Sequence, residues 1–333
     1  MALLVSVVVV TWDGRDRLVR CLEALDRQRF RDFETLVVDN GSSDGSAELV
    51  AERWPAARLI VAPNNVGFAM GNNLAFDLAE GELVATLNND AYAEPEWLGA
   101  LVVELERAPA AGAVASRIVL ASGPERLDSA GIEVDRLGTA HNRLLGQPVA
   151  TAEEATVVFG ASAAAALYRR AALDQVGLFD EDFVSYYEDV DLAWRLRLAG
   201  WECRCAPAAI VRHEHSATGR TGSPLKEYLL GRNRIWSIAQ SYPAPELWWW
   251  LPMIVGYDAI TLAGKSALTR GSAPLRGRLA ALRGLGRSIG KRRRFYRERA
   301  TAAGIADVRR WIGSRQLPSV VGQLGAWREL ARA

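Results

Sequence analysis

The 333-residue sequence contains only three cysteines, Cys21, Cys203 and Cys205. They are too few and too unevenly spaced for a disulfide framework, and an isolated Cys-x-Cys pair is a poor signature for a metal site. We therefore expect reduced thiols and a cytoplasmic protein. Histidine is equally scarce, and two of the three histidines, His213 and His215, stand in one short stretch.

Long hydrophobic runs are also missing. The best candidate, Leu247–Leu262, is shorter than the roughly 20 residues that a membrane-spanning helix needs, and it contains Asp258. The segment from Met1 to Val10 is apolar but short, has no basic flank and runs into a turn. We expect a buried first strand there rather than a signal peptide.

The dinucleotide-binding fingerprint G-x-G-x-x-G does not follow the first expected strand, which argues against a nicotinamide-dependent dehydrogenase. A sugar-phosphate nucleotidyltransferase would carry a glycine-rich loop with a basic residue at that place, and Thr11-Trp12-Asp13-Gly14-Arg15 is not such a loop. The nucleotidyltransferase stays an alternative, because it shares the sheet and also binds nucleotide and metal.

The net charge is only +1, but acidic side chains are nearly missing from the end of the chain. Residues 1–264 hold 23 basic and 36 acidic side chains, whereas residues 265–333 hold 17 basic and 3 acidic ones. This asymmetry predicts a basic tail with a partner of its own. No nucleic-acid-binding motif accompanies the tail, so we do not expect nucleic acid to be that partner.

What the chain does have is an alternation of β-branched runs and helical patterns over its first part. Such runs are typical of strands buried on both faces, and their alternation with helices predicts an α/β fold with a mostly parallel sheet flanked by helices. The expected strands are 3–11, 34–39, 58–62, 83–87 and 113–119, and the expected helices are 15–28, 47–53, 69–79 and 96–107.

Beyond residue 120 the pattern loosens, and 121–148 is interpreted as a long excursion over the surface. Because the chain exceeds the size at which one core keeps growing, we expect a large domain with an appendage. The domain is predicted to span 1–240, with halves of about 1–120 and 121–240, followed by a helical, basic and amphipathic extension at 241–333. Further expected elements are a small-residue run at 156–168, helices at 190–198 and 225–240, and a strand at 203–211. The stretch 275–299 places Arg and Lys among Leu, Ala and Gly.

Carboxylates stand at three places in a fixed order. Asp39 and Asp90 each follow an apolar strand-like run, where an α/β sheet presents side chains to a crevice, and Glu188-Asp189 opens a later helix. The first two carboxylates suit a nucleotide and a divalent metal, and the third can accept a proton from a second substrate. This order is typical of glycosyl transfer from a nucleotide-linked sugar.

The loop at 63–73, Pro-Asn-Asn-Val-Gly-Phe-Ala-Met-Gly-Asn-Asn, permits close backbone approach to a ligand, although a tight turn explains it equally well. Asp44 is expected to cap the helix that follows Asp39. Two interpretations exist for Lys226 and Arg232-Asn233: contact with a diphosphate, or exposure on a solvated helical face. The solvated face is the favoured interpretation.

Leu-Asn-Asn-Asp at 87–90 suits Mg²⁺ or Mn²⁺, which prefer oxygen ligands and substrate phosphates. Asp90 is the predicted metal ligand, and Asn88 occupies the place of the first aspartate in a D-x-D pair. His213 is the second candidate ligand. The alternatives are a solvated turn for Asp90, a structural role for His213, and a contribution to the helix dipole for Glu188.

Six strings in order give the chain a family resemblance. They are Val-Thr-Trp-Asp-Gly-Arg, Val-Asp-Asn-Gly-Ser-Ser-Asp-Gly, Asn-Asn-Val-Gly-Phe-Ala-Met-Gly-Asn-Asn, Leu-Asn-Asn-Asp, Phe-Asp-Glu-Asp-Phe and Tyr-Glu-Asp-Val-Asp-Leu-Ala-Trp-Arg. Over roughly residues 5–235, the chain resembles the family 2 inverting glycosyltransferases of the GT-A fold, in particular the bacterial rhamnosyltransferase-like branch that builds surface polysaccharides.

The resemblance implies a hexosyltransferase that moves a sugar from a nucleotide-diphosphate donor, such as dTDP-rhamnose or a UDP-sugar, to a glycan or lipid-linked hydroxyl. It makes Asp189 the general base beside Glu188, and Asp90 and His213 the metal site. It implies that Thr11, Asp13, Asp39 and Asn65 line the nucleotide pocket, although Asp13 departs from the usual asparagine. We extend the pocket to the neighbouring Arg15, Asn40, Gly67, Asn72 and Asn89. A degenerate subunit that binds the nucleotide sugar without turnover stays an alternative.

The extension suggests where the reaction takes place. Trp248-Trp249-Trp250 resembles an interfacial aromatic cluster, and Lys291-Arg292-Arg293-Arg294 follows it. We expect a peripheral protein on the inner, anionic face of the cell membrane, next to a lipid-linked acceptor. The alternative is a helical subdomain that packs its tryptophans on the core or on a second subunit in a homodimer.

Overall fold

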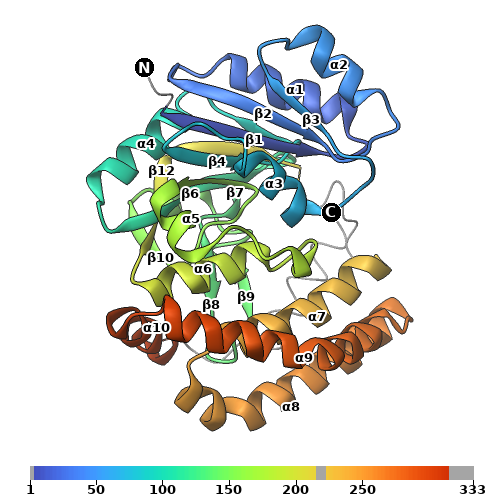
Figure 1. Cartoon of the computed structure of the whole chain (residues 1–333), viewed down its shortest axis with the longest axis vertical. Coiled ribbons are helices and arrows are strands. Elements are labelled where there is room, and N and C mark those ends of the chain that lie inside the picture. Colours follow the sequence, from blue (N-terminus) through green and yellow to red (C-terminus); the bar gives the residue numbers. More distant parts are fainter. Residues whose placement is uncertain (1–3, 215–222, 315–333) are drawn as a thin grey trace.

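The computed structural model describes residues 4–214 and 223–314, and its centre is a ten-stranded sheet in the order β10-β12-β6-β11-β4-β1-β2-β3, with β5 on β12 and β7 on β6 (Figure 1). A separate two-stranded sheet joins β8 and β9. The strands are β1 Val5–Thr11, β2 Phe33–Asp39, β3 Arg58–Val61, β4 Leu83–Leu87, β5 Ala91–Ala93, β6 Ala111–Leu120, β7 Gly123–Ser129, β8 Ile132–Val134, β9 Ala140–Asn142, β10 Thr156–Val158, β11 Ala165–Arg169 and β12 Glu202–His213.

The first part of the chain folds as the alternation predicts. Strands β4, β1, β2 and β3 are parallel neighbours; the first three expected helices lie between them in the chain, and the fourth follows β5. Val5, Val7, Val8 and Val9 are fully buried, as a β-branched run covered on both faces requires. The helices are α1 Arg15–Asp26, α2 Ser46–Arg53, α3 Phe68–Phe76 and α4 Trp97–Arg107. The predicted α/β class with a sheet flanked by helices is confirmed.

The second part of the sheet is mixed, because β11 runs antiparallel to both β4 and β6. The small-residue run expected at 156–168 is divided into β10 and β11. The start of β11 lies beside the end of β4, where the Asn88 amide donates to the Ala164 carbonyl at 2.9 Å. The elements that follow are the 3₁₀ turns η1 Val149–Ala152 and η2 Glu181–Phe183, and the helices α5 Arg170–Val176 and α6 Glu188–Ala199.

Four helices form the lower layer in Figure 1, namely α7 Pro224–Ser241, α8 Ala244–Thr269, α9 Ala273–Glu298 and α10 Ala302–Ser314. Helix α9 packs along α7, and α10 packs against α6. Arg197 links α6 to the lower helical layer. Its guanidinium pairs with Asp307 of α10 at 2.6 Å and lies 4.3 Å from the centroid of the Trp311 ring. None of the helices within 4–214 and 223–314 is both long and apolar enough to span a membrane.

Candidate functional site

The predicted site residues of the first half meet where β1, β2 and β4 end. Thr11 and Asp39 are register partners at the ends of β1 and β2, and the Asn40 amide donates to the Thr11 carbonyl at 2.8 Å. From the end of β4, Asn89 Nδ2 donates to Thr11 Oγ1 at 2.9 Å. The parallel register thus places the three strand ends at one edge of the sheet.

Two loops at this edge are joined by aspartates. Asp13 lies at a φ of 46° and accepts a hydrogen bond from the Ser43 amide at 2.8 Å. Asp44 accepts hydrogen bonds from the Arg15 amide at 2.9 Å and from the Ser46 amide at 3.1 Å. Asp44 was predicted to be the N-cap residue of the helix that follows Asp39. The N-cap residue of α2 is instead Gly45, the next residue along the chain.

The predicted nucleotide residues of the next loop hold its backbone. Asn40 Nδ2 donates to Asn65 Oδ1 at 3.1 Å and to the Gly67 carbonyl at 3.2 Å. Asn72 Nδ2 donates to the Phe68 carbonyl of its own helix at 2.8 Å. These contacts shape the loop, and direct contact of the same residues with a nucleotide stays a prediction.

Asp90 and His213 come together because β12 pairs with β5, which follows Asp90 in the chain. His213 Nε2 lies 3.2 Å from Asp90 Oδ1, and His213 Nδ1 lies 2.6 Å from Asp128 Oδ2 on β7. Burial alone would lower the pKa of His213, but the two carboxylates outweigh burial and raise this pKa to about 10. Asp128 was missed by the sequence reasoning, because 121–148 has no periodic pattern that marks it.

The donor atoms at Asp90 fit a hard divalent cation. Within the described part of the chain, Asn88 Oδ1 is a buried oxygen that accepts no hydrogen bond, and the buried Asp90 Oδ1 lies 3.2 Å from His213 Nε2. Oxygen is the ligand that Mg²⁺ and Mn²⁺ prefer. No group of three or more His, Cys, Asp or Glu side chains among these residues has the geometry of a metal site. A cation at Asp90 therefore needs further ligands, which the phosphates of a nucleotide can supply.

Glu188 and Asp189 begin α6 and reach the same edge. Asp189 Oδ2 accepts a hydrogen bond from the Ala163 amide at 3.2 Å, and Asp189 Oδ1 accepts one from the Val190 amide at 2.8 Å. The neighbouring Ala164 is the residue whose carbonyl binds the Asn88 amide. Two adjacent residues before β11 thus link the Glu-Asp pair to the residues that follow β4.

The side chain of Glu188 is buried, and the adjacent Asp189 is half-buried. Burial raises the pKa of Asp189 above its ordinary value, and burial together with the charge of Asp189 raises the pKa of Glu188 further. Glu188 Oε2 accepts no hydrogen bond within the described residues. Tyr168 on β11 lies close enough that the Asp189 charge adds to the effect of burial in raising its pKa.

The interpretation of Arg232-Asn233 as a solvated helical face is wrong. Asn233 is fully buried, and its amide binds the loop that precedes Glu188. Lys226 lies over the ring of Tyr186 at 5.4 Å from its centroid. Two residues of this region therefore face the loop of the Glu-Asp pair instead of solvent. His215 lies outside the described residues.

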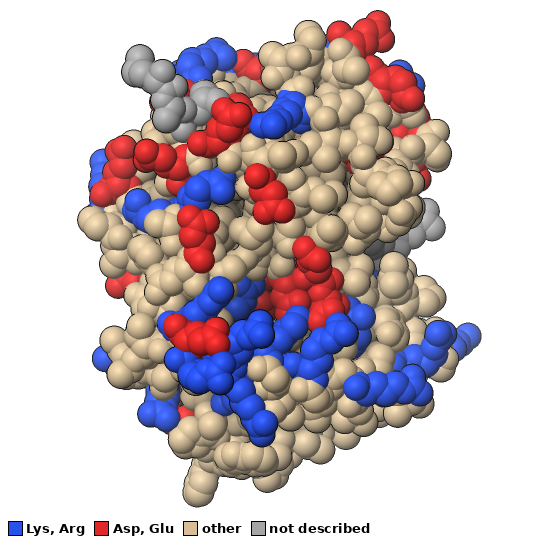
Figure 2. All heavy atoms as spheres, viewed as in Figure 1, with Lys and Arg blue, Asp and Glu red and all other residues tan. Residues whose placement is uncertain are grey.

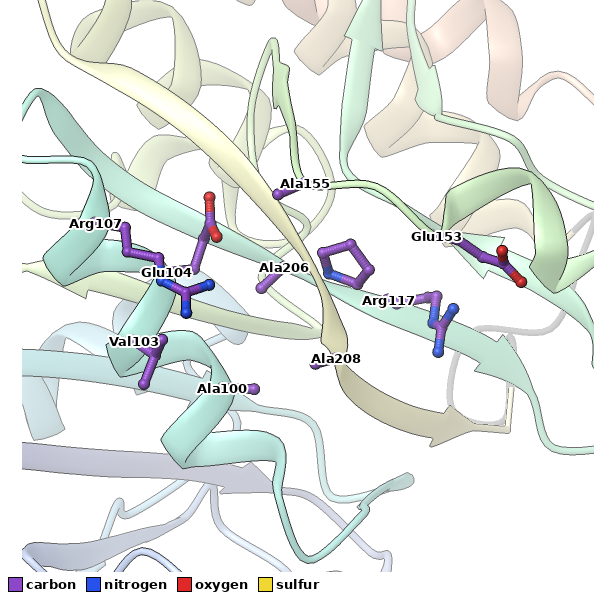
Figure 3. A pocket seen from close by; sticks show the side chains of 10 residues that line it. Ala100, Val103, Glu104, Arg107, Arg117, Glu153, Ala155, Ala206 and Ala208 are labelled. Atoms are coloured by element: carbon purple, nitrogen blue, oxygen red, sulfur yellow. The ribbon is translucent and has the colours of Figure 1, made fainter.

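A pocket of about 550 Å³ opens elsewhere, on the side of β12 that faces α4 (Figure 3). Glu104 in its wall is paired with Arg204 at 2.6 Å. The predicted site residues do not line it, so we do not interpret it as the substrate site. Its lining residues are Ala100, Val103, Glu104, Arg107, Arg117, Glu153, Ala155, Ala206, Pro207 and Ala208.

Comparison with known proteins identifies the family of this chain. Residues 6–177 match the family described as Glycosyl transferase family 2. The chain belongs to glycosyltransferase family 2. It is 32% identical, over 64% of its own length and 77% of the other chain, to an N-acetylglucosaminyl-diphospho-decaprenol L-rhamnosyltransferase of Mycobacterium tuberculosis. It is also 30% identical, over 68% of its length, to the O-antigen biosynthesis protein RfbC of Myxococcus xanthus, of which it spans only 18%.

These relatives place the glycosyltransferase in the rhamnosyltransferase-like branch, as the sequence strings predicted. Solved structures agree on the GT-A architecture. GalNAc-T7 with UDP, GalNAc and Mn²⁺ superposes with a TM-score of 0.62 over 87% of this chain and 57% of the other, at 15% identity. TarS 1-349 of S. aureus superposes with a TM-score of 0.57 over 93% of this chain and 90% of the other, at 19% identity.

Burial of Glu188 predicts that the protein loses stability when this carboxyl group ionises. Since the folded-state pKa of Glu188 is raised, its ionised form destabilises the fold, and the stability lost grows as pH rises from the ordinary carboxyl pKa through the folded-state value. Glu188→Gln should raise Tm at pH 8 by a few degrees, the response of a large domain to about 1 kcal/mol. The gain should vanish near pH 4.

Differential scanning calorimetry between pH 4 and pH 8 measures this gain. Glu52→Gln on the exposed face of α2 serves as the control, and its Tm should follow the wild type at every pH. A Tm difference for Glu188→Gln that stays constant with pH would contradict the explanation from burial.

Proposed function

We propose that this glycosyltransferase moves a sugar from a nucleotide-diphosphate donor to a hydroxyl of a glycan or lipid-linked acceptor, with inversion at the anomeric carbon. The observation that carries the proposal is the contact of Asp189 with Ala163, next to the Ala164–Asn88 bond that leads to Asp90. The candidate base Asp189 and Asn88, two residues before the candidate metal ligand Asp90, are thereby bonded to adjacent residues. The rhamnosyltransferase relatives favour dTDP-rhamnose as donor, with a UDP-sugar as the alternative.

The donor nucleotide is proposed to occupy the edge formed by β1, β2 and β4. Asp39 is buried at the end of β2, and its carboxylate is placed to accept hydrogen bonds from a base or ribose. The Asn40–Asn65 contact holds the adjacent loop in a fixed shape, which lowers the ordering cost of binding. The proposed pocket consists of Thr11, Asp13, Arg15, Asp39, Asn40, Asn65, Gly67, Asn72 and Asn89.

We assign the divalent cation, Mg²⁺ or Mn²⁺, to Asp90 and His213. When bound, it would neutralise the charge that develops on the departing diphosphate. Asp128 fixes the His213 ring through Nδ1, which leaves Nε2 as the nitrogen that faces Asp90. Because only a neutral imidazole coordinates a metal, a cation bound there would have to displace the Nε2 proton. GalNAc-T7 and a mannosyltransferase of Pyrobaculum calidifontis with GDP-Man, which share the fold, were both solved with Mn²⁺.

Asp189 is the proposed general base. Its carboxylate takes the proton of the acceptor hydroxyl while that oxygen forms a bond to the anomeric carbon and the bond to the diphosphate breaks. The two backbone amides that donate to Asp189 hold the carboxylate in one orientation. Its raised pKa makes the carboxylate a better proton acceptor at neutral pH than an exposed aspartate.

The extension at 241–333 is proposed as the part that brings a transferase unit of about 1–240 to its acceptor. Every exposed residue of the 26-residue helix α8 is uncharged, and the helix is about 39 Å long at 1.5 Å per residue. These residues are Ala244, Pro245, Trp248, Trp249, Pro252, Met253, Val255, Gly256, Ala259, Ile260, Ala263, Ala267 and Leu268.

The charged residues of α8 are held in ion pairs with neighbouring helices. Glu246 pairs with Arg309, and Lys265 pairs with Glu227. Asp258 pairs with both Arg234 and Arg278. The outer face is therefore a continuous apolar stripe, and its most exposed side chains are Trp248 and Trp249, at 71% and 79%.

Charge complementarity favours an anionic lipid surface as the partner of this stripe. Figure 2 shows basic side chains gathered in a band across the lower half of the molecule, with uncharged surface below the band. The exposed basic residues of α9 include Arg276, Arg283, Arg293 and Arg294. An apolar stripe with tryptophans beside a basic band is the pattern of a helix that lies in the plane of a membrane. We place the protein on the inner face of the cell membrane, with a second copy of the chain as the alternative occupant.

Asp189→Asn should abolish sugar transfer, because an amide cannot accept the acceptor proton, while donor binding should change less than about threefold. Transfer from a panel of nucleotide sugars, with calorimetric titration of the bound nucleotide, measures both quantities. Turnover within about tenfold of the wild type would exclude Asp189 as the base. A wild-type protein that binds a donor but never transfers or hydrolyses it would instead support the degenerate subunit.

Asp90→Ala should lower kcat by about 100-fold or more, the scale of losing one group that stabilises developing charge. It should also remove the effect of Mn²⁺ on nucleotide affinity, which titration with and without Mn²⁺ detects independently of turnover. Asp77→Ala, at an exposed position after α3, is the control and should keep the Mn²⁺ effect. If Asp90→Ala retains the Mn²⁺ effect, the cation is bound elsewhere.

The wild type should float with vesicles that contain phosphatidylglycerol, and 0.5 M salt should weaken this binding. Trp248→Glu combined with Trp249→Glu should reduce the bound fraction at least about tenfold, since both changes place charge in the lipid interface. Val61→Glu on the edge strand β3, at another exposed apolar site, should bind like the wild type.

Light scattering of the lipid-free protein distinguishes a membrane from a second copy of the chain as the partner of the apolar stripe. A wild-type dimer that the double tryptophan variant converts to a monomer, together with no flotation, would assign the stripe to a second copy. Equal flotation of the double variant and the wild type would refute the role of the stripe.

A further inference from the structure

The loop that delivers the Glu-Asp pair has an unfavourable backbone. Val184, Tyr186 and Tyr187 all adopt left-handed φ angles, of 66°, 66° and 72°. Each non-glycine residue in this region costs on the order of 1–3 kcal/mol, and the surrounding structure must hold it there. Tyr187 is the N-cap residue of α6 and has no side-chain capping bond, so α6 itself does not supply the restraint.

A single side chain on α7 contacts three backbone carbonyls of this loop. Asn233 is fully buried, and its Nδ2 atom lies within hydrogen-bond distance of the carbonyls of Phe183 at 2.9 Å, Ser185 at 2.9 Å and Tyr186 at 2.6 Å. Three carbonyl oxygens converging on one nitrogen require a donor, and an uncharged amide donates without a charged group in this buried place.

Neighbouring basic residues complete the support. Arg232 donates to the carbonyls of Asp182 and Phe183 at 2.8 and 3.0 Å, and its Nε donates to Asn233 Oδ1 at 2.8 Å. From α9, Lys291 contacts both oxygens of Asp180 at 2.6 and 2.7 Å and also contacts Asp182 at 2.6 Å. The loop is therefore held by α7 and α9 over the residues that lead to the Glu-Asp pair.

The opposite side of the loop contacts the nucleotide half. The Ala69 amide donates to the Val184 carbonyl at 3.0 Å, and the Phe68 amide donates to Ser185 Oγ at 3.3 Å. Gly67 is required at this approach, because a Cβ there would lie 2.7 Å from the Val184 side chain. The loop thus lies between the start of α3 and Asn233, and contacts on both sides hold the residues that lead into α6.

We infer that Asn233 is a positioning residue for sugar transfer: it holds residues 183–186 in the conformation that places the Asp189 carboxylate at the acceptor hydroxyl. The inference rests on the proposed role of Asp189. Asn233 itself does not touch the reacting atoms, and it acts through the backbone that precedes α6. Its loss should misplace the base without altering the nucleotide pocket.

Asn233→Ala and Asn233→Asp test this role. The aspartate keeps the shape of the side chain but presents acceptors to three carbonyl oxygens, so it should be at least as damaging as alanine. Both variants should lower kcat by about 100-fold, the loss typical of a misplacement near 1 Å, whereas KM for the donor and the nucleotide Kd should stay within about threefold.

Gln28→Ala is the matched control. Gln28 is also a fully buried amide with three hydrogen bonds, to the Ala24 and Glu94 carbonyls and from the Leu98 amide, and it lies between α1 and α4. It should lower Tm by a similar amount and keep kcat per folded enzyme within about twofold. Equal kcat losses in Gln28→Ala and Asn233→Ala would reduce Asn233 to a stabilising residue and overturn the inference.

If the Asn233 variants do not fold, Arg232→Gln removes part of the same support at a half-buried position and should show a smaller kcat loss with the same unchanged donor KM. Wild-type kcat in this variant would overturn the inference. Asp189→Asn separates the two proposals: if it keeps turnover, the assignment of the base fails, whereas full activity in Asn233→Ala with inactive Asp189→Asn overturns only the positioning role.

Discussion

The insertion of β11 beside β4 is the constraint on which the site depends. Because β11 runs antiparallel to β4, its first residues lie at the carboxyl end of β4, where the Asn88 amide binds the Ala164 carbonyl. The preceding Ala163 amide binds Asp189. One reversal of strand direction therefore brings the second half of the chain to the strand ends of the first half. A parallel strand in that position would present its carboxyl end there instead, and the start of α6 would have no such attachment.

The first half of the site was predictable because it follows from strand geometry. Continuous apolar runs that end in Asp39 or Asp90 place these residues at strand ends, and parallel strands share one edge. Asp128 was not predictable, because β7 pairs with β6 through register shifts and carries no regular alternation. Asn233 was misinterpreted for a different reason. Helical spacing shows which residues share a face of α7, but not that a loop some 50 residues earlier in the chain places its carbonyls against that face.

Several groups at the candidate site destabilise the fold. Glu188 is buried beside the half-buried Asp189, and three non-glycine residues before them adopt positive φ angles. Such features persist only where surrounding contacts over-determine them, and their clustering is typical of catalytic sites. The hydrogen bonds of Asn233 and the ion pairs of Lys291 show where the compensating contacts lie. They come from the helices after residue 223, so the C-terminal part of the chain stabilises the catalytic part.

The ion pair between Arg197 and Asp307 has a consequence for modular exchange within the family. Arg197 is almost fully buried on α6, and Asp307 on α10 supplies its carboxylate. A chimera that joined this transferase unit to a helical tail without a carboxylate at the position of Asp307 would leave the guanidinium without that partner, and stranded buried charges of this kind cost about 3–5 kcal/mol. An exchanged tail must therefore keep a carboxylate on α10 that faces Arg197 of α6.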